Sequence, residues 1–184
     1  PEIAGLTYEK TMDLTYAEEF DVYYYKDGYK LINIQESGKY LIVPEGKEAP
    51  EGLDEDIKII QQPLQHVYMA ASASMSLIAS IDAVDCVKFS GVDESDWYVD
   101  AARQAMQDGN MIYAGKYSEP DYENLVDGDC DLAIESTMIL HTPKVQEMIE
   151  DLDIPVLIDY ASYESHPLGR TEWVKLYGAL FNKE

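Results

Sequence analysis

The sequence predicts an α/β fold: a three-layer lobe with a central, mostly parallel sheet, preceded by an antiparallel β segment. Three observations predict it. Up to about residue 56, aromatic and apolar runs are separated by turn dipeptides, which is typical of hairpins. After Ile57, short apolar runs alternate with helical patterns, the signature of βαβ units. From Leu168 to Lys183 an apolar helical stripe follows, so the fold is expected to end in a helix.

The antiparallel segment is expected to hold three strands joined by the turns Asp27-Gly28 and Ser37-Gly38. These strands are predicted at Phe20 to Tyr25, Tyr29 to Gln35 and Lys39 to Val43. The next stretch, residues 44–56, carries Pro, Gly and acidic residues without periodicity, which predicts a surface loop. The tyrosines at 23–25 could form a ligand platform, but a half-buried strand that packs on the lobe is the favoured interpretation.

The parallel part is expected to hold five strands with helices between them. The strands are predicted at His66 to Ala70, Cys86 to Phe89, Met111 to Ala114, Asp131 to Glu135 and Pro155 to Ile158. The helices are predicted near Ser74 to Ala83, Trp97 to Gln107, Asp121 to Val126 and Pro143 to Asp151. We expect the flavodoxin-like strand order 2-1-3-4-5. Cys86 and Cys130, which form no CxxC pair, are expected to be free thiols in the core.

Composition excludes several function classes. The 184 residues include 36 acidic and 13 basic side chains, a formal net charge of -23. Such a surface repels phosphate backbones and anionic lipid headgroups, so neither a nucleic acid nor a membrane surface is expected as a partner. A hydrophobic content of 46% is enough for a packed core, and no apolar run reaches the length of a membrane span.

The ligand site is expected beyond the carboxyl ends of the parallel strands, where the strand order reverses. In the flavodoxin-like order this point lies between the first and third strands, with the ends of the fourth and fifth nearby. These loops carry hydroxyls, a lysine, tyrosines and an arginine, which is a set suited to binding. The candidate ligand-binding residues are Ser72, Ser74, Lys116, Tyr117, Glu135, Ser136, Thr137, Tyr160 and Arg170.

Two pairs of these candidates carry different weight. Ser72 and Ser74 stand where a helix begins, so capping of that helix explains them as well as ligand contact does. Lys116 and Tyr117 are the sharper signal, because a loop at the reversal point has little structural need for either residue.

Catalytic motifs are missing from the sequence. It contains no G-x-S-x-G elbow, P-loop, HExxH or post-strand GxGxxG pattern. Its three histidines are scattered and form no metal-site spacing. Glu135 could serve as an acid or base, but no nucleophile accompanies it. We therefore expect no catalytic residue, no metal site and no cofactor.

Motifs in order along the chain carry a family resemblance. They are Val67-Tyr68-Met69-Ala70-Ala71-Ser72, Ala114-Gly115-Lys116-Tyr117-Ser118-Glu119-Pro120-Asp121-Tyr122-Glu123, Cys130-Asp131-Leu132-Ala133-Ile134-Glu135-Ser136, Ile154-Pro155-Val156-Leu157-Ile158 and His166-Pro167-Leu168-Gly169-Arg170-Thr171-Glu172-Trp173. Together they resemble the iron-siderophore, haem and cobalamin class of ABC-transporter solute-binding proteins, over about two thirds of the chain.

The resemblance implies a domain plan. In that family one long helix joins two α/β lobes, and the ligand lies between them. Residues 1–65 would be an N-terminal β segment packed on the lobe, 66–166 the ligand-binding lobe, and 167–184 the start of the linker helix. That role would leave the helix stripe unpaired in this chain, and the second lobe would be absent from it.

The resemblance also implies a function: capture of a siderophore, haem or corrinoid chelate outside the cytoplasm and delivery to an ABC permease. The protein would be a monomer, either in the periplasm or at the cell surface as a lipoprotein. Its only attachment to the membrane would be a lipid anchor on a segment before Pro1 that has been removed from this sequence. Glu123, near the start of the helix after the third strand, would dock on permease arginines; an acid that favours a helix amino terminus is the alternative. An Arg and a Lys with several tyrosines favour an anionic, partly aromatic ligand.

Two other functions stay open from sequence. A metal chelatase or cofactor-assembly enzyme could use a similar α/β scaffold. A free-standing adhesive or sensory lobe is the third possibility.

Overall fold

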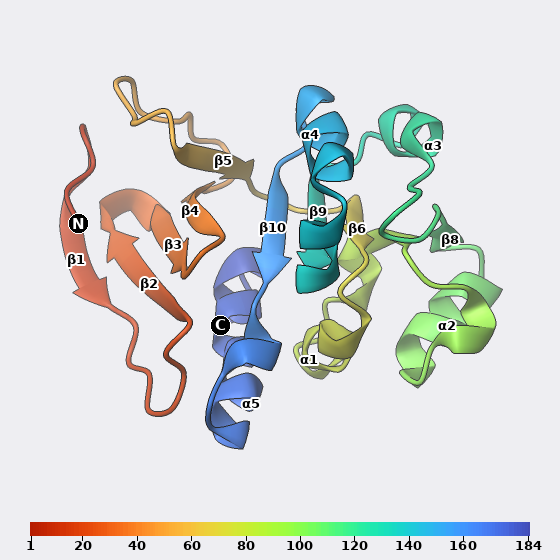
Figure 1. Cartoon of the computed structure of the whole chain (residues 1–184). Helices are drawn as coiled ribbons and strands as arrows, with labels where there is room; N and C mark the ends of the chain where they lie inside the picture. The colour runs from red at the N-terminus through yellow and green to blue at the C-terminus, as the bar shows by residue number, and fades with distance from the viewer. The chain divides into compact units, whose positions relative to one another are not determined.

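Two five-stranded sheets hold all ten strands of the chain, which the computed structural model describes from Pro1 to Glu184 (Figure 1). Sheet A belongs to unit 1, residues 1–63 and 160–184, and sheet B belongs to unit 2, residues 64–159. Unit 2 is therefore continuous in sequence, whereas unit 1 is built from both ends of the chain. The predicted α/β class, with an antiparallel segment before a parallel sheet and a helix at the end, is confirmed.

Sheet A follows the order of the chain, β1-β2-β3-β4-β5. Its strands are β1 (Tyr8–Thr11), β2 (Phe20–Tyr25), β3 (Lys30–Ile34), β4 (Gly38–Val43) and β5 (Ile57–Gln61). Neighbours from β1 to β4 are antiparallel, and β5 pairs with β4 in parallel. The three predicted strands and the loop at residues 44–56 are confirmed, whereas β1 and β5 were not predicted. All four residues of β1 are exposed, so this strand has no apolar alternation to reveal it.

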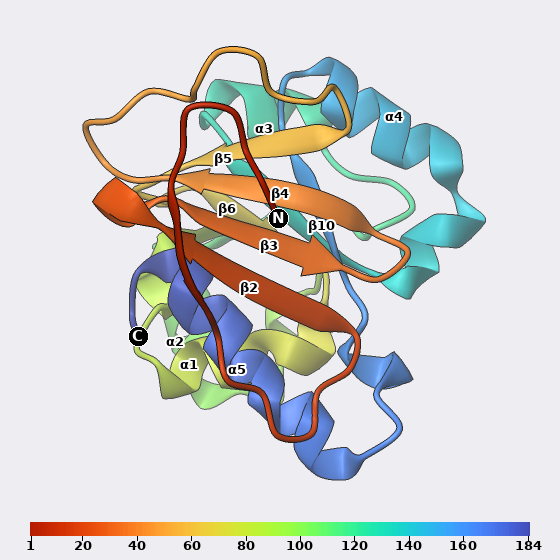
Figure 2. The same ribbon diagram turned by 90° about the vertical axis from the view of Figure 1, so that its left-hand side faces the viewer.

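The last helix, α5 (Pro167–Phe181), packs on sheet A within unit 1 and lies beside β2 in two views (Figures 1 and 2). The rings of Phe20 and Trp173 meet edge to face at 5.0 Å between centroids. The Lys30 ammonium donates a hydrogen bond to the Ala179 carbonyl at 3.1 Å. The predicted helix is confirmed. The expectation of an unpaired apolar stripe is wrong, because the stripe packs on sheet A. The pattern of the helix alone does not show this contact, since the strands of sheet A lie far away in the sequence.

Two carboxylates tie α5 and the turn before it to the loop at residues 15–19. Glu172 accepts hydrogen bonds from the backbone amides of residues 15, 16 and 17 at 2.7 to 2.8 Å. Glu164 accepts from the amides of residues 18 and 19, and from the Trp173 indole at 2.9 Å. Burial opposes ionisation of Glu172, but these amides and Lys175 prevail and lower its pKa to about 2.

Sheet B is wholly parallel, and its strands stand in the order β10-β9-β6-β7-β8. They are β6 (Val67–Met69), β7 (Val87–Ser90), β8 (Ile112–Tyr113), β9 (Leu132–Ser136) and β10 (Val156–Asp159). The connecting helices are α1 (Met75–Ser80), α2 (Asp100–Gln107), α3 (Tyr122–Asp127) and α4 (Pro143–Asp151). Within unit 2, α1 and α2 lie together on one side of the sheet and α3 and α4 on the other (Figures 1 and 2). All five strands and all four helices were predicted, with ends that differ by a few residues.

The predicted strand order is wrong. Counted along the chain, the parallel strands stand as 3-2-1-4-5 rather than in the flavodoxin-like order 2-1-3-4-5. The third strand, β8, is therefore at the edge of the sheet, where it pairs only with β7. Its two residues, Ile112 and Tyr113, are 45% and 41% exposed, which suits an edge and not a strand covered on both faces.

Short 3-10 turns complete the fold. They are η1 (Lys26–Gly28), η2 (Ser72–Ser74), η3 (Val84–Cys86), η4 (Glu94–Asp96), η5 (Thr137–His141) and η6 (Ala161–Tyr163). Cys86 and Cys130 form no disulfide, as predicted, but both are only half-buried because each precedes its strand. No helix combines the length and the apolar character that a membrane crossing requires.

Candidate functional site

The observed strand order moves the reversal point of sheet B to the boundary between β6 and β9. The chain leaves β6 towards β7 on one side, and β9 leads to β10 on the other. Loops that diverge in this way leave a crevice at the carboxyl ends of the strands, which is where open α/β sheets bind ligands. The loops that matter are therefore residues 70–74, after β6, and 136–142, after β9.

Three polar side chains come together on one face at this edge. The Ser74 hydroxyl donates a hydrogen bond to Asp159 Oδ2 at 2.5 Å, and both residues are buried, at 5% and 6% exposure. Asp159 ends β10 and is the register partner of Ser136 at the end of β9, so their side chains point to the same face. A hydroxyl after β6 thus reaches past β9 to a carboxylate on β10. Such a group of donors and acceptors can orient a polar ligand.

The serines differ in what they do. Ser74 makes no capping hydrogen bond to α1, so capping does not account for its hydroxyl. Ser72 is exposed within η2. Ser136 accepts a hydrogen bond from the Met138 amide at 3.2 Å and so caps η5, in which Thr137 is half-buried.

Glu135 lies one residue before the end of β9 and is fully buried. Neither of its carboxyl oxygens has a hydrogen-bond partner. Burial raises its pKa to about 8, because the charged form loses its hydration and gains no compensating contact. Glu135 therefore lies beneath the edge and does not line it in this conformation.

Lys116 and Tyr117 follow β8, which is two strand positions from β6 in the observed order. Two strand spacings correspond to about 10 Å. The placement of this loop at the reversal point was therefore wrong, and it lies towards the edge of sheet B. Lys116 is exposed and Tyr117 is half-buried.

Tyr160 and Arg170 belong to unit 1, whereas the other candidates belong to unit 2. Tyr160 is buried and meets the Tyr163 ring edge to face at 5.0 Å between centroids. Arg170 is exposed on α5 and donates to the Ser162 carbonyl at 3.4 Å.

Asp159 is the residue of this group that was not among the ligand-binding residues predicted from sequence. Its signal was a single carboxylate directly after the apolar run Val156 to Ile158. An acidic residue at the end of a buried strand needs a partner or a role, and here Ser74 is a partner.

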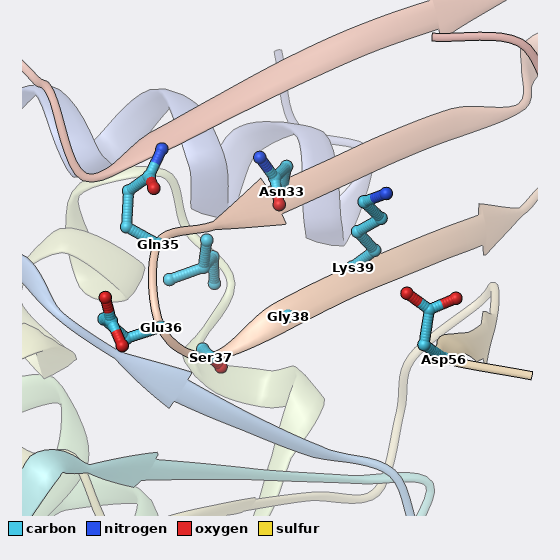
Figure 3. A pocket seen from close by; sticks show the side chains of 8 residues that line it. Asn33, Gln35, Glu36, Ser37, Gly38, Lys39 and Asp56 are labelled. Atoms are coloured by element: carbon cyan, nitrogen blue, oxygen red, sulfur yellow. The ribbon is translucent and has the colours of Figure 1, made fainter.

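Neither a metal-binding group nor the shallow pocket in unit 1 involves the three side chains at this edge. No group of three or more His, Cys, Asp or Glu side chains is arranged to hold a metal ion. The pocket surrounds the turn between β3 and β4 in unit 1 (Figure 3). Its polar lining includes Asn33, Glu36, Lys39 and Asp56, with no fully buried polar group among them.

Comparison with known proteins gives one distant similarity. No family model matches the chain. An uncharacterized lipoprotein of Methanocaldococcus jannaschii is 25% identical over an alignment 201 positions long, which covers 95% of this chain. The chain spans about half of that relative, 47% of its length.

Proposed function

We propose that this chain is the amino-terminal ligand-binding lobe of an extracytoplasmic receptor that captures a metal chelate for an ABC permease, without chemistry of its own. The observation that carries the proposal is the group Ser74, Ser136 and Asp159 at the carboxyl edge of sheet B. This edge, at the reversal of strand order, is the place where open α/β sheets bind ligands.

The lipoprotein relative supports the extracytoplasmic location. Proteins of that name carry a lipid anchor, and the strongly acidic composition of this chain offers no other means of binding an anionic membrane. A protein as long as the relative has room for a second lobe, which the clamshell mode of binding requires. The chelate class, a siderophore, haem or corrinoid, rests on the resemblance of the sequence motifs.

Calorimetry with a ferric hydroxamate, a ferric catecholate, haemin and a cobalamin tests the proposal. We expect one of these chelates to bind the full-length receptor, and to bind this lobe far more weakly because half of the cleft is missing. Asp159→Asn and Ser74→Ala should each weaken that binding roughly tenfold, the effect of one hydrogen bond to a charged group. Ser76→Ala, at an exposed serine two residues later in α1, is the matched control. Failure of every chelate to bind the full-length protein contradicts the proposal.

Glu123 is the proposed contact with the permease. It is exposed in the first turn of α3, while the Asp121 side chain caps that helix by accepting from the Asn124 amide at 3.1 Å. Because Asp121 already supplies the cap, the helix does not require the charge of Glu123. Glu123→Lys should impair uptake and leave chelate affinity unchanged, since like charges in contact can cost several kcal/mol. Asp127→Lys, at the other end of α3, should transport normally; normal transport by Glu123→Lys contradicts the docking role.

A chelatase or cofactor-assembly enzyme is the second candidate, and Glu135 is the residue that favours it. Its pKa of about 8 falls in the range of a general acid. Its burial, however, separates it from any substrate at the edge. Incubation of the protein with a porphyrin and a divalent metal decides the matter: metal insertion above the uncatalysed rate, abolished in Glu135→Gln, would establish the enzyme.

A further inference from the structure

The loop after β8, residues 115–119, is joined to sheet B by a hydrogen bond from a buried tyrosine. Tyr68 in β6 is fully buried, and its hydroxyl donates a hydrogen bond to the Gly115 carbonyl at 2.7 Å. The loop closes on itself where the Asp121 amide donates to the Ala114 carbonyl at 2.7 Å. Gly115 has φ +85°, and a Cβ there would stand 2.3 Å from the Glu119 carbonyl oxygen. The loop is therefore tightly wound, and Tyr68 joins it to a central strand.

Glu135 lies on the same face of sheet B as Tyr68. In the register of β6 and β9, Tyr68 is opposite Ala133, and Glu135 follows two residues later, so the two side chains point the same way. The charge of Glu135 contributes to raising the pKa of Tyr68, after burial as the larger cause. The phenol and the carboxyl group therefore lie within each other's electrostatic field.

The other titratable groups around this pair are also acids. Tyr122, from α3, has its pKa raised by burial and then by Glu135. Tyr113 from β8 and Cys130, before β9, act on Tyr68 in the same direction. No cation is among the groups that act on Glu135 or Tyr68. An ionised Glu135 would thus meet the phenol hydroxyls of Tyr68 and Tyr122, and no cation, among these groups.

We propose that Tyr68 and Glu135 are positioning residues for the loop at residues 115–119. While Glu135 is uncharged, Tyr68 holds the loop through the Gly115 carbonyl; when Glu135 ionises, the Tyr68 hydroxyl donates to the carboxylate and the loop is released. The inference goes beyond the proposed function, because this loop, with Lys116 and Tyr117, follows the edge strand β8 and lies outside the group Ser74, Ser136 and Asp159.

The exchange of acceptors follows from hydrogen-bond strength. A bond to a carboxylate is about twice as strong as one between neutral groups. An unpaired buried charge is also far more costly than an unpaired carbonyl, and the Gly115 carbonyl, which is only half-buried, can turn to water. The tie is therefore stable only as long as Glu135 keeps its proton.

Amide NMR spectra of the protein between pH 6 and 9.5 test the inference without any ligand. In the wild type, the amides of residues 115–119 should shift together with a midpoint near pH 8, the pKa of Glu135. Glu135→Gln should abolish this transition. Tyr68→Phe should also abolish it, with the loop already released at pH 6 and the Glu119 amide exchanging with solvent roughly fivefold to tenfold faster. Tyr122→Phe is the matched control and should titrate like the wild type.

Three outcomes overturn the inference: no transition at residues 115–119 in the wild type, a transition that persists in Glu135→Gln, or one that disappears in Tyr122→Phe. If Glu135→Gln does not fold, the wild type and Tyr68→Phe decide. Amides of sheet A serve as a check that the chain stays folded over this range. If the amides of residues 115–119 show the pH transition but the protein binds no chelate, the proposed function is refuted and this inference stands. If the protein binds a chelate but these amides show no transition, this inference is refuted and the proposed function stands.

Discussion

The two units bury glutamates in opposite ways. In unit 1, Glu172 accepts hydrogen bonds from three backbone amides and forms a salt bridge with Lys175, and its pKa is lowered to about 2. In unit 2, Glu135 is buried without a hydrogen-bond partner, and its pKa is raised to about 8. Burial is common to both, so the difference comes from the donors that the chain supplies. A buried carboxylate with hydrogen-bond donors stabilises the fold. A buried carboxyl group without donors destabilises the fold once it ionises, so its charge state can alter the structure.

The largest expected effect is the loss of stability caused by Glu135 as pH rises. The unfolded chain releases this proton near pH 4.5, whereas the folded protein keeps it up to about pH 8, so unfolding becomes progressively easier between these values. The loss should approach roughly 4 kcal/mol at pH 8, as each pH unit corresponds to about 1.4 kcal/mol. Denaturant unfolding at several pH values measures it. In Glu135→Met this part of the slope should vanish; an unchanged slope would show that Glu135 is not the group.

Glu172 should give the opposite dependence and the next largest effect. Its folded pKa lies below its unfolded value, so its contribution is complete above about pH 4.5 and is lost as the pH falls towards 2. Glu172→Ala at pH 7 leaves three amides and Lys175 without this acceptor and should cost about 3 kcal/mol in unfolding free energy. Glu9→Ala, an exposed residue of β1, should change it little. Similar losses in the two variants would remove the distinction between the units.

Ser74→Ala should have the smallest effect on stability. It removes one hydrogen bond to the buried Asp159 carboxylate, which corresponds to about 1.5 kcal/mol. Thermal unfolding of Ser74→Ala and of the exposed control Ser76→Ala measures the difference. Equal melting temperatures would mean that the Ser74 hydroxyl contributes nothing to the fold and is retained for another reason.

Much of the fold could be predicted from sequence because local patterns encode it. Apolar runs and turn dipeptides located three strands of sheet A, and the alternation of runs and helices located every strand and helix of unit 2. Strand order is not local: it depends on whether the chain, after α2, places β8 beside β7 or on the other side of β6, and the sequence carries no direct sign of that choice. The exposed pair Ile112 and Tyr113 identifies β8 as an edge strand only after the fold is known.

The site could be predicted only in part for the same reason. Ser74 and Ser136 were selected because strand ends can be located from local pattern. Asp159 was missed, since its contact with Ser74 joins residues 85 positions apart. Lys116 and Tyr117 were placed at the reversal point because the strand order assumed for them was wrong.

The division of unit 1 between the two ends of the chain has a consequence for the order of folding. Residues 64–159 are continuous, so unit 2 can complete itself as soon as it leaves the ribosome. Sheet A emerges before unit 2 but must wait for α5, which follows unit 2 in the chain, before Phe20 gains Trp173 as a neighbour and the loop at residues 15–19 gains its carboxylates. During that interval sheet A is the part of these residues most exposed to misassembly.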